Sequence, residues 1–371
     1  MRIGLLTTLN TNIGDDFIRE GIIDTVLRLR KGVNTDFVSI NKHDPFSAYT
    51  SWQLRLKRFL DCRPRAKRLL SYFKSFPWSR FDSCDLIIQC GTPVLWHGCQ
   101  YSEWANPIWR DILYRLSKSG KPILNIGAGA TYPWEKKPQT LIGDHDEDFV
   151  RLMLESCRLT TVRDTLAKKL FQSLDYDVDI ICCPALLAGQ VYASPTQPSR
   201  KVVINYMEGG GHYDWDQGID KKVWQKTMVS VVNELTKHGW NVTLLAHDQK
   251  ESELARTIWP NLACNLPQTP KEYFEFIKDA AFGIFNRMHA SVAAAGLGIP
   301  SIAIGTDARN LMVAQIGLPV FYVKEASADV MLEATRQLME QRQAVSARLL
   351  YLKEKTQMQY EVLLAPLCSS N

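Results

Sequence analysis

The chain has 371 residues, close to the size at which a single hydrophobic core stops growing, so its length favours two domains. With 46% hydrophobic and 22% charged residues, the composition excludes a wholly disordered chain. The net charge of +5 is too small to indicate nucleic-acid binding unless it is concentrated in one place. Residues 52–80 hold nine basic residues against one acid, so this segment carries +8 and the remainder of the chain −3.

The first half of the chain alternates short apolar runs with amphipathic stretches of helix length, a pattern typical of a parallel α/β sheet. Strands are predicted over residues 2–7, 36–40, 85–89, 122–126, 159–162 and 177–182. Helices are predicted near residues 15–29, 104–117, 147–157 and 164–173. The Gly-Ala-Gly-Ala run at 127–130 is expected to form a glycine-rich turn after the fourth strand.

Residues 184–200 hold three prolines among small polar residues and predict a linker between domains. The alternation then restarts. Strands are predicted over 202–205, 242–246, 281–285, 301–305 and 320–323, with helices near 222–238, 251–258, 271–278, 289–296, 310–316 and from 328 to about 363. We therefore expect an α/β fold of two doubly wound, Rossmann-like domains, 1–190 and 200–371, facing each other across a cleft that binds ligands.

The turn after the first strand reads Asn12-Ile13-Gly14-Asp15-Asp16 and leads into a helix. At the carboxyl edge of a parallel sheet, a helix N-terminus offers unpaired N–H groups. On one interpretation Asp15 and Asp16 only cap the helix and complement its dipole. On the other, one of the two accepts hydrogen bonds from sugar hydroxyls or acts as a general base.

Two further turns of the first domain suggest ligand binding. Gly91 follows the third strand and precedes an aromatic stretch of Trp96, His97, Tyr101, Trp104 and Trp109. Such rings suit the apolar faces of sugars, and they are equally common as core residues. Arg163 lies between a strand and the helix that Asp164 would cap, where an arginine has no capping role, so an anion site is indicated.

In the second domain, a triple glycine at 209–211 follows the first strand, where α/β domains cradle phosphate, although no P-loop lysine follows it. Arg287 and His289 stand two residues apart at a strand-to-helix turn. Facing Arg163 across the cleft, they would combine anion binding with a titratable acid.

Other chemistries have little support. The seven histidines are scattered and no metal-binding spacing appears, so no metal is expected. The elbow of a serine hydrolase is missing. Nine cysteines without a C-x-x-C pair predict buried thiols in a reducing, cytoplasmic compartment. The first residues predict a strand and not a signal peptide, and no apolar run is long enough for a membrane span.

Taken together, several motifs resemble the polysaccharide pyruvyl transferase family from Asn12 to about Leu318. They are Asn12-Ile13-Gly14-Asp15-Asp16, Thr161-Val162-Arg163-Asp164, Cys183-Pro184-Ala185, Arg287-Met288-His289-Ala290 and Gly298-Ile299-Pro300. The resemblance implies a GT-B-like fold. It also implies transfer of a pyruvyl group from phosphoenolpyruvate onto hydroxyls of a glycan sugar as a ketal, with release of phosphate and with no cofactor besides this donor.

The resemblance implies roles for individual residues. Arg163, Arg287 and His289 would bind phosphoenolpyruvate, with Met288 contributing its backbone, and His289 would be the acid. Apart from the resemblance, the position of Asp15 and Asp16 across the cleft makes one of them the expected base. The remaining expected binding residues are Asn12, Gly14, Gly91, Gly210 and Arg309. The chain departs from the family at three places: Cys90-Gly91-Thr92 replaces a glycine triplet, Cys183 replaces an aspartate, and Arg309 stands for a lysine.

Two other functions stay open: a GT-B glycosyltransferase that holds a nucleotide-sugar diphosphate at the triple glycine, and a catalytically silent glycan-binding protein. Residues 52–80 would be an insertion in the first domain. It is either a solvated basic helix or a patch that contacts an anionic membrane at its inner face and meets a lipid-linked glycan. No nucleic-acid-binding fold accompanies its mixture of basic and aromatic residues.

Overall fold

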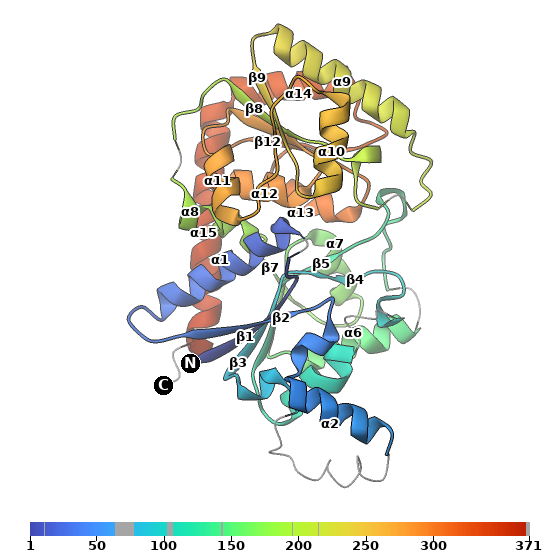
Figure 1. Cartoon of the computed structure of the whole chain (residues 1–371), viewed down its shortest axis with the longest axis vertical. Helices are drawn as coiled ribbons and strands as arrows, with labels where there is room; N and C mark the ends of the chain where they lie inside the picture. Colours follow the sequence, from blue (N-terminus) through green and yellow to red (C-terminus); the bar gives the residue numbers. More distant parts are fainter. Residues whose placement is uncertain are drawn as a thin grey trace.

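The computed structural model describes residues 1–10, 12–63, 78–101, 107–141, 144–194, 196–213 and 215–368. Two α/β units lie one above the other, and the long C-terminal helix runs beside both (Figure 1). Residues 64–77, about half of the basic, aromatic segment 52–80, lie outside the described residues, and so does Trp104. In the described part of the chain, no helix has the length and apolar character needed to cross a membrane.

The N-terminal unit contains a parallel sheet in the order β2-β1-β3-β5-β6-β7, and β4 pairs with β5 beyond the end of β3. Its strands are β1 (Arg2–Thr7), β2 (Asp36–Asn41), β3 (Leu86–Cys90), β4 (Pro93–Leu95), β5 (Ile123–Ala130), β6 (Leu159–Val162) and β7 (Asp179–Ile180). Successive residues of β3 pack into different core clusters, Leu86 and Ile88 into one and Ile87 into the other. The sheet is therefore buried on both faces, which explains its continuous apolar runs.

The C-terminal unit contains a second parallel sheet, in the order β10-β9-β8-β11-β12-β13. Its strands are β8 (Lys201–Asn205), β9 (Asn241–Leu245), β10 (Cys264–Asn265), β11 (Phe282–Phe285), β12 (Ser301–Gly305) and β13 (Val320–Tyr322). The strand order reverses between β8 and β11 here, and between β1 and β3 in the first sheet. Doubly wound sheets bind ligands outside the carboxyl ends of their strands at such reversals. The predicted α/β fold of two Rossmann-like units is confirmed.

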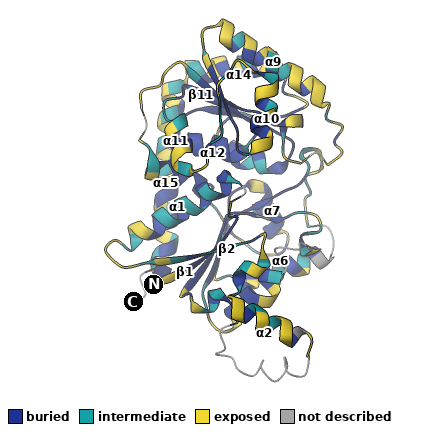
Figure 2. Cartoon of the chain, in the orientation of Figure 1, coloured by how far each residue is buried: buried dark blue, intermediate teal, exposed yellow. Residues whose placement is uncertain are grey.

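Helices surround both sheets. In the first unit they are α1 (Ile13–Leu29), α2 (Ser51–Asp61), α5 (Tyr114–Lys118), α6 (Asp144–Ser156), α7 (Thr165–Gln172) and α8 (Gly189–Tyr192), with the π-helix η4 (Ile108–Leu113). In the second they are α9 (Lys221–Lys237), α10 (Gln249–Ile258), α11 (Pro270–Ile277), α12 (Met288–Gly296), α13 (Leu311–Gln315), α14 (Ala328–Glu340) and α15 (Arg342–Cys368). Their outward faces are exposed while the strands are buried (Figure 2).

Short 3-10 helices complete the chain. They are η1 (Pro45–Ala48), η2 (Arg80–Ser83), η3 (Cys99–Tyr101), η5 (Trp134–Lys136), η6 (Pro184–Leu187), η7 (Glu208–Gly210) and η8 (Ala308–Asn310). The linker expected over 184–200 is wrong in its first part, because η6 is buried and packs against both α1 and α12. An alanine at Gly21 would place its Cβ 2.1 Å from the backbone oxygen of Pro184. Helix α1 therefore approaches η6 so closely that only glycine fits at this position.

The C-terminal helix ties the two units together. Helix α15 packs against α12 and also against α1 of the N-terminal unit. The hydroxyl of Tyr360 donates to the backbone oxygen of Cys182 at 2.8 Å, and Arg30 donates to the backbone oxygen of Cys368. One hydrophobic cluster accordingly continues from the first sheet through η6 into the second, which fixes the relative position of the two facing sheet edges.

The Gly-Ala-Gly-Ala turn expected at 127–130 is also wrong, because these residues continue β5 to Ala130. Gly127 has φ of +68°, and the pairing of β5 with β6 shifts register between Asn125 and Ala128. The glycine therefore forms a bulge inside the strand, and its N–H donates to the hydroxyl of Thr161 at 2.9 Å.

Candidate active site

A cavity of about 1000 Å³ lies between the two units, at the carboxyl ends of their strands. Residues that follow β1 to β6 line it from one side, and residues that follow β8, β9, β11 and β12 line it from the other. Five of the seven histidines converge here, although they are scattered in the sequence: His43, His97, His212, His247 and His289. Even so, no group of three or more metal-binding side chains occurs among the described residues.

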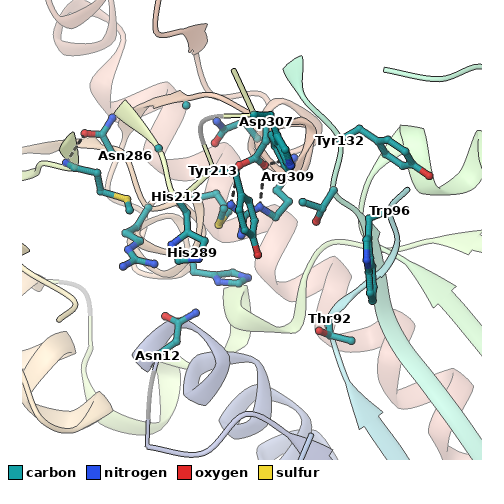
Figure 3. A pocket seen from close by; sticks show the side chains of 18 of the residues that line it. Asn12, Thr92, Trp96, Tyr132, His212, Tyr213, Asn286, His289, Asp307 and Arg309 are labelled. Carbon is teal, nitrogen blue, oxygen red and sulfur yellow. Dashed lines mark hydrogen bonds and ion pairs between the residues drawn. The ribbon is translucent and has the colours of Figure 1, made fainter. Parts of the chain in front are cut away.

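At the centre of the cavity, Arg163 of the first unit meets His289 of the second. Nη1 of Arg163 lies 3.3 Å from Nε2 of His289 (His289 is labelled in Figure 3), and both side chains are buried. Burial first, and then the charge of Arg163, lowers the pKa of His289 to about 3. The imidazole is therefore neutral near pH 7 in this structure, and its role as the acid stays a prediction that requires an anion beside it.

Two glycines make room for this pair. A Cβ on Gly14 would lie 2.7 Å from Nδ1 of His289, and a Cβ on Gly129 would lie 2.7 Å from Nε of Arg163. Real Cβ atoms do not approach other atoms this closely. Gly14, which was expected to bind substrate, therefore serves the site by letting the first turn of α1 pack against His289.

Arg163 has no carboxylate partner. Within the part of the chain that the structure describes, no Asp or Glu oxygen lies within 4.0 Å of its guanidinium, although the side chain is only 1% exposed. Cys183, which replaces an aspartate of the family, has its sulfur 3.8 Å from Nη1 of Arg163, and burial raises the pKa of this thiol so that it carries no charge. A buried guanidinium that no carboxylate contacts directly is costly, so the site is suited to an anionic ligand.

The two acidic residues at the start of α1 differ in their surroundings. Asp15 is buried and lines the cavity, with its carboxylate 3.8 Å from Nζ of Lys42. Burial alone would raise the pKa of Asp15, but Lys42, a hydrogen bond with Thr8 and the charge of Arg163 together hold it below the usual value. Asp16 instead pairs with Arg19 at 2.7 Å and is not among the residues that line the cavity, so of the two predicted candidates the structure brings only Asp15 to the cavity.

Lys42 is a functional candidate that the sequence analysis missed. It directly follows β2, is 4% exposed, and donates from Nζ to the hydroxyl of Thr92 at 2.6 Å. Burial lowers its pKa and Asp15 opposes this shift. Thr92 stands in the predicted departure Cys90-Gly91-Thr92, so this departure supplies a partner for Lys42. Position at the carboxyl edge of a strand was the signal that could have identified Lys42.

Arg287 lines the cavity as predicted, but carboxylates already hold its guanidinium. Nε donates to Glu251 at 2.6 Å and Nη2 donates to Asp248 at 2.7 Å. The charge that it can offer to an anion is therefore smaller than its sequence position indicated. Met288 lines the cavity at the first turn of α12, and no side chain caps that helix.

Arg309 is held in a similar way. Its Nε and Nη2 bond to the two carboxylate oxygens of Asp307 at 2.8 and 2.7 Å, and its guanidinium lies over the ring of Tyr213, 4.7 Å from the centroid. It lines the cavity, as predicted for this departure from the family, and in doing so it supports an aromatic side chain (Figure 3).

Several expected residues lie elsewhere. Gly91 packs against Ile18, and Gly210 packs against Val323. Neither glycine lines the cavity, whereas the next residue, Gly211, does. The structure therefore does not bring these two predicted binding residues to the cavity. Asn12 does line the cavity, and it also caps α1 by accepting from the N–H of Gly14 at 3.1 Å.

The aromatic stretch after β3 divides between site and core. Trp96 and His97 line the cavity, whereas Trp109 is buried and donates to Gln89 at 2.9 Å, and Tyr101 is exposed. His212 and His247, which the sequence analysis did not select, line the cavity as well. Overall, five lysines and arginines line the cavity against three aspartates, which favours anionic ligands.

Comparison with known proteins identifies both a family and a fold. A family model described as polysaccharide pyruvyl transferase matches residues 12–308. Among the curated proteins, none matches the chain.

Three solved structures are similar over nearly the whole length. A putative UDP-N-acetylglucosamine 2-epimerase from Listeria monocytogenes is 10% identical, with a TM-score of 0.54, over 94% of this chain and 90% of that one. UDP-GlcNAc 2-epimerase from Neisseria meningitidis, bound to UDP-GlcNAc, is 12% identical, with a TM-score of 0.54, over 98% and 100%. The S. aureus MnaA structure with UDP is 11% identical, with a TM-score of 0.52, over 98% and 97%. Such likeness shows the fold alone, and it confirms the GT-B-like architecture.

Proposed function

Since this chain belongs to the polysaccharide pyruvyl transferase family, we propose that it transfers a pyruvyl group from phosphoenolpyruvate onto two hydroxyls of a glycan sugar. The product is a cyclic ketal, and phosphate is released. No cofactor takes part besides the donor.

The observation that carries this proposal is the buried guanidinium of Arg163 without a carboxylate partner. Phosphoenolpyruvate brings a carboxylate and a phosphate, and either group can pair with the planar fork of an arginine through two hydrogen bonds. Lys42 supplies a second buried cation on the same side of the cavity, and its charge acts on His289, as does that of Arg163. Arg287 and Met288 line the opposite side, at the start of α12.

The reaction requires one proton to be delivered and two to be removed. A proton added to the methylene carbon of the donor leaves an oxocarbenium-like centre at C2. One sugar hydroxyl attacks this centre and loses its proton. The bond between C2 and the phosphate oxygen then breaks, the phosphate leaves with the electron pair, and a second hydroxyl closes the ring with loss of its own proton. One of the two released protons balances the one delivered, and the other leaves with the phosphate.

His289 is the proposed proton donor. In the unoccupied cavity, burial and Arg163 keep its pKa near 3. A donor anion that binds Arg163 offsets the positive charge beside the imidazole and adds negative charge next to it, and both changes raise the pKa toward neutrality. Protonation of the acid is thereby coupled to arrival of its substrate.

Asp15 is the proposed base for the sugar hydroxyl. Its carboxylate is ionised because Lys42, a hydrogen bond with Thr8 and the charge of Arg163 lower its pKa, and it lines the cavity from the first turn of α1. An ionised carboxylate can accept a hydrogen bond from the attacking hydroxyl and take its proton as the bond to C2 forms.

The test is incubation of the purified protein with phosphoenolpyruvate and a panel of free and lipid-linked glycans. We expect release of inorganic phosphate together with a gain of one pyruvyl ketal in the glycan mass. With phosphoenolpyruvate well below its KM, Arg163→Ala should reduce both signals about tenfold or more, while Arg336→Ala, which removes an exposed arginine on α14, should change neither. Release of nucleotide from a nucleotide-sugar, without transfer from phosphoenolpyruvate, would overturn the proposal in favour of a glycosyltransferase.

A further inference from the structure

The proposed donor chemistry does not use an aromatic stack on the C-terminal wall of the cavity. The rings of Tyr213 and Trp215 have centroids 4.7 Å apart at an interplanar angle of 28°, and His212 meets Tyr213 edge-on at 4.5 Å. On Tyr213 lies the guanidinium of Arg309, which Asp307 fixes through two hydrogen bonds. The three rings and the guanidinium therefore form one ordered assembly.

The stack is held in place and yet remains accessible. Thr306 donates from its hydroxyl to the backbone oxygen of Tyr213 at 2.7 Å. Trp215 has φ of +49°, in the left-handed region that bulky side chains rarely adopt, and Asp216 has φ of +52°. Still, Tyr213 is 38% and Trp215 37% exposed, and both line the cavity. Strained backbone that holds partly exposed aromatic rings at a cavity is typical of a ligand site.

The N-terminal unit contributes aromatic side chains on the other side of the cavity. Trp96 follows β4 and Tyr132 follows β5, and Figure 3 shows both on the side opposite His212 and Tyr213. The stack shares its cavity with the proposed acid, because Tyr213, Arg309 and His289 all line it. A ligand on the stack would thus extend toward the proposed acid.

We propose that Tyr213 and Trp215 are the acceptor subsite, where a pyranose ring of the glycan lays its apolar C–H face on the aromatic stack. This proposal rests on the proposed function and names its acceptor class: an oligosaccharide whose modified sugar lies toward Asp15 and His289, while a flanking sugar stacks on Tyr213 and Trp215. Aromatic side chains suit this task because they bind apolar ring faces while polar groups around them take the hydroxyls.

The main competing occupant is a nucleotide base, which would stack on the same rings. The charges around the stack do not distinguish a sugar ring from a nucleotide base, so the experiment has to distinguish them. A glycan ring is expected here because phosphoenolpyruvate, a small dianionic or trianionic molecule, is held by Arg163 and Lys42 deeper in the cavity, which leaves the more exposed aromatic part for the uncharged partner.

The experiment compares Trp215→Ala and Tyr213→Ala with Tyr351→Ala, which removes an exposed ring on α15 outside the cavity. Binding is measured by saturation-transfer NMR without phosphoenolpyruvate, using lactose, cellobiose, chitobiose and maltose as probes. We expect saturation of sugar C–H protons in the wild type and in the control, and its loss in the two site variants. Trp215→Phe should restore it, because a ring is again present.

Kinetics with the best acceptor give the second readout. The apparent KM for the acceptor should rise about tenfold in Trp215→Ala, whereas the KM for phosphoenolpyruvate should stay unchanged. A raised donor KM with an unchanged acceptor KM would overturn the subsite, and so would saturation of UDP protons in place of sugar protons. Failure of every disaccharide to bind overturns it as well. Glycan binding that depends on Trp215, without phosphate release from phosphoenolpyruvate, would refute the proposed function and leave the subsite standing.

Discussion

Nη1 of Arg163 lies 3.3 Å from Nε2 of His289, and the two residues come from different sheets on opposite sides of the cavity. An arginine can only donate, so Nε2 is the acceptor and the neutral imidazole carries its proton on Nδ1. The contact joins the two units at the point where the donor is proposed to bind. A bound anion would compete for the same guanidinium, which makes this pair the centre of the following predictions.

Arg163 and Arg287 should differ in their importance for donor binding. Arg163→Ala should raise the KM for phosphoenolpyruvate about 10- to 150-fold, the range expected for a lost charge-assisted hydrogen bond. Arg287→Ala should raise it less, because Glu251 and Asp248 already neutralise Arg287. The measurement is steady-state release of phosphate at saturating acceptor. Equal effects of the two substitutions would show that the carboxylates do not reduce the role of Arg287.

Donor binding should be accompanied by proton uptake at His289. The pKa of this residue is about 3 in the unoccupied cavity and should rise when the anion binds, so the complex takes up a proton between pH 6 and 7.5. Isothermal titration calorimetry in buffers of different ionisation enthalpy counts the protons. His289→Asn should remove this uptake. Subtracting the proton count of the variant from that of the wild type removes any contribution from protonation of the donor phosphate. Identical proton counts for both proteins would contradict the role of His289 as the acid.

The same residue should make the empty protein less stable in acid. Because the pKa of His289 in the folded chain lies below its value of 6.5 in the unfolded chain, the unfolded state binds the proton first. Its contribution to stability is therefore complete above pH 6.5 and is lost progressively as the pH falls toward 3. Urea unfolding at pH 7 and pH 5 should show a smaller loss for His289→Asn than for the wild type. Buried His247 should retain part of the acid sensitivity in the variant.

Much of the fold was predictable because local patterns match the elements. The strands at Arg2–Thr7, Leu159–Val162 and Ser301–Gly305 have the predicted bounds, since each apolar run is short and its ends are marked by polar or turn residues. The errors arose where tertiary packing decides. Small residues after Ile126 continue β5 through a bulge, and the proline-containing run at residue 184 is buried between helices.

The site was predictable as far as strand ends reveal it. Arg163, Arg287, Met288 and His289 all line the cavity, as their positions after strands indicated. The distinction between Asp15 and Asp16 could not be made, because a step of one residue turns the side chain by about 100° around the helix and only the packed neighbours decide which one faces the cavity.

Ion pairs formed by residues distant in the sequence were equally hidden. The carboxylates that hold Arg287 lie 36 and 39 residues earlier in the chain, on another strand-to-helix turn. Nothing in the local sequence of Arg287 reveals them. Lys42, by contrast, could have been predicted from its position directly after a strand. It was overlooked because no motif surrounds it.

Lys42 should contribute to donor binding. Lys42→Met keeps the side-chain length and removes the charge, so the KM for phosphoenolpyruvate should rise about 10-fold or more. The pKa of Asp15 should rise too, because Lys42 is the largest influence that lowers it. Activity of the variant should consequently fall on the acidic side of the wild-type pH profile. The control is Lys201→Met, which removes a lysine that pairs with Asp279 at the amino-terminal end of β8, outside the cavity. This substitution should alter neither the donor KM nor the pH profile. An unchanged donor KM in Lys42→Met would exclude Lys42 from the site.

Gly14 and Gly21 lie on the same helix, and alanine at these positions should produce different defects: a loss of activity at Gly14 and a loss of stability at Gly21. In Gly14→Ala the new Cβ would lie 2.7 Å from Nδ1 and 2.9 Å from Cβ of His289, so the acid is displaced together with the start of α12. The gain of about 1 kcal/mol in helix propensity of α1 offsets part of this strain. We expect a loss in kcat of about 100-fold with little change in the free energy of unfolding.

In Gly21→Ala the new Cβ would lie 2.1 Å from the backbone oxygen of Pro184, which cannot move without shifting η6. Here the free energy of unfolding should fall by about 1–3 kcal/mol, the usual cost of overpacking. Circular dichroism during urea unfolding and initial rates of phosphate release measure the two properties in parallel. Full activity in Gly14→Ala would mean that close packing of α1 against His289 does not position the acid, and the catalytic role of that histidine would then rest on its contact with Arg163 alone.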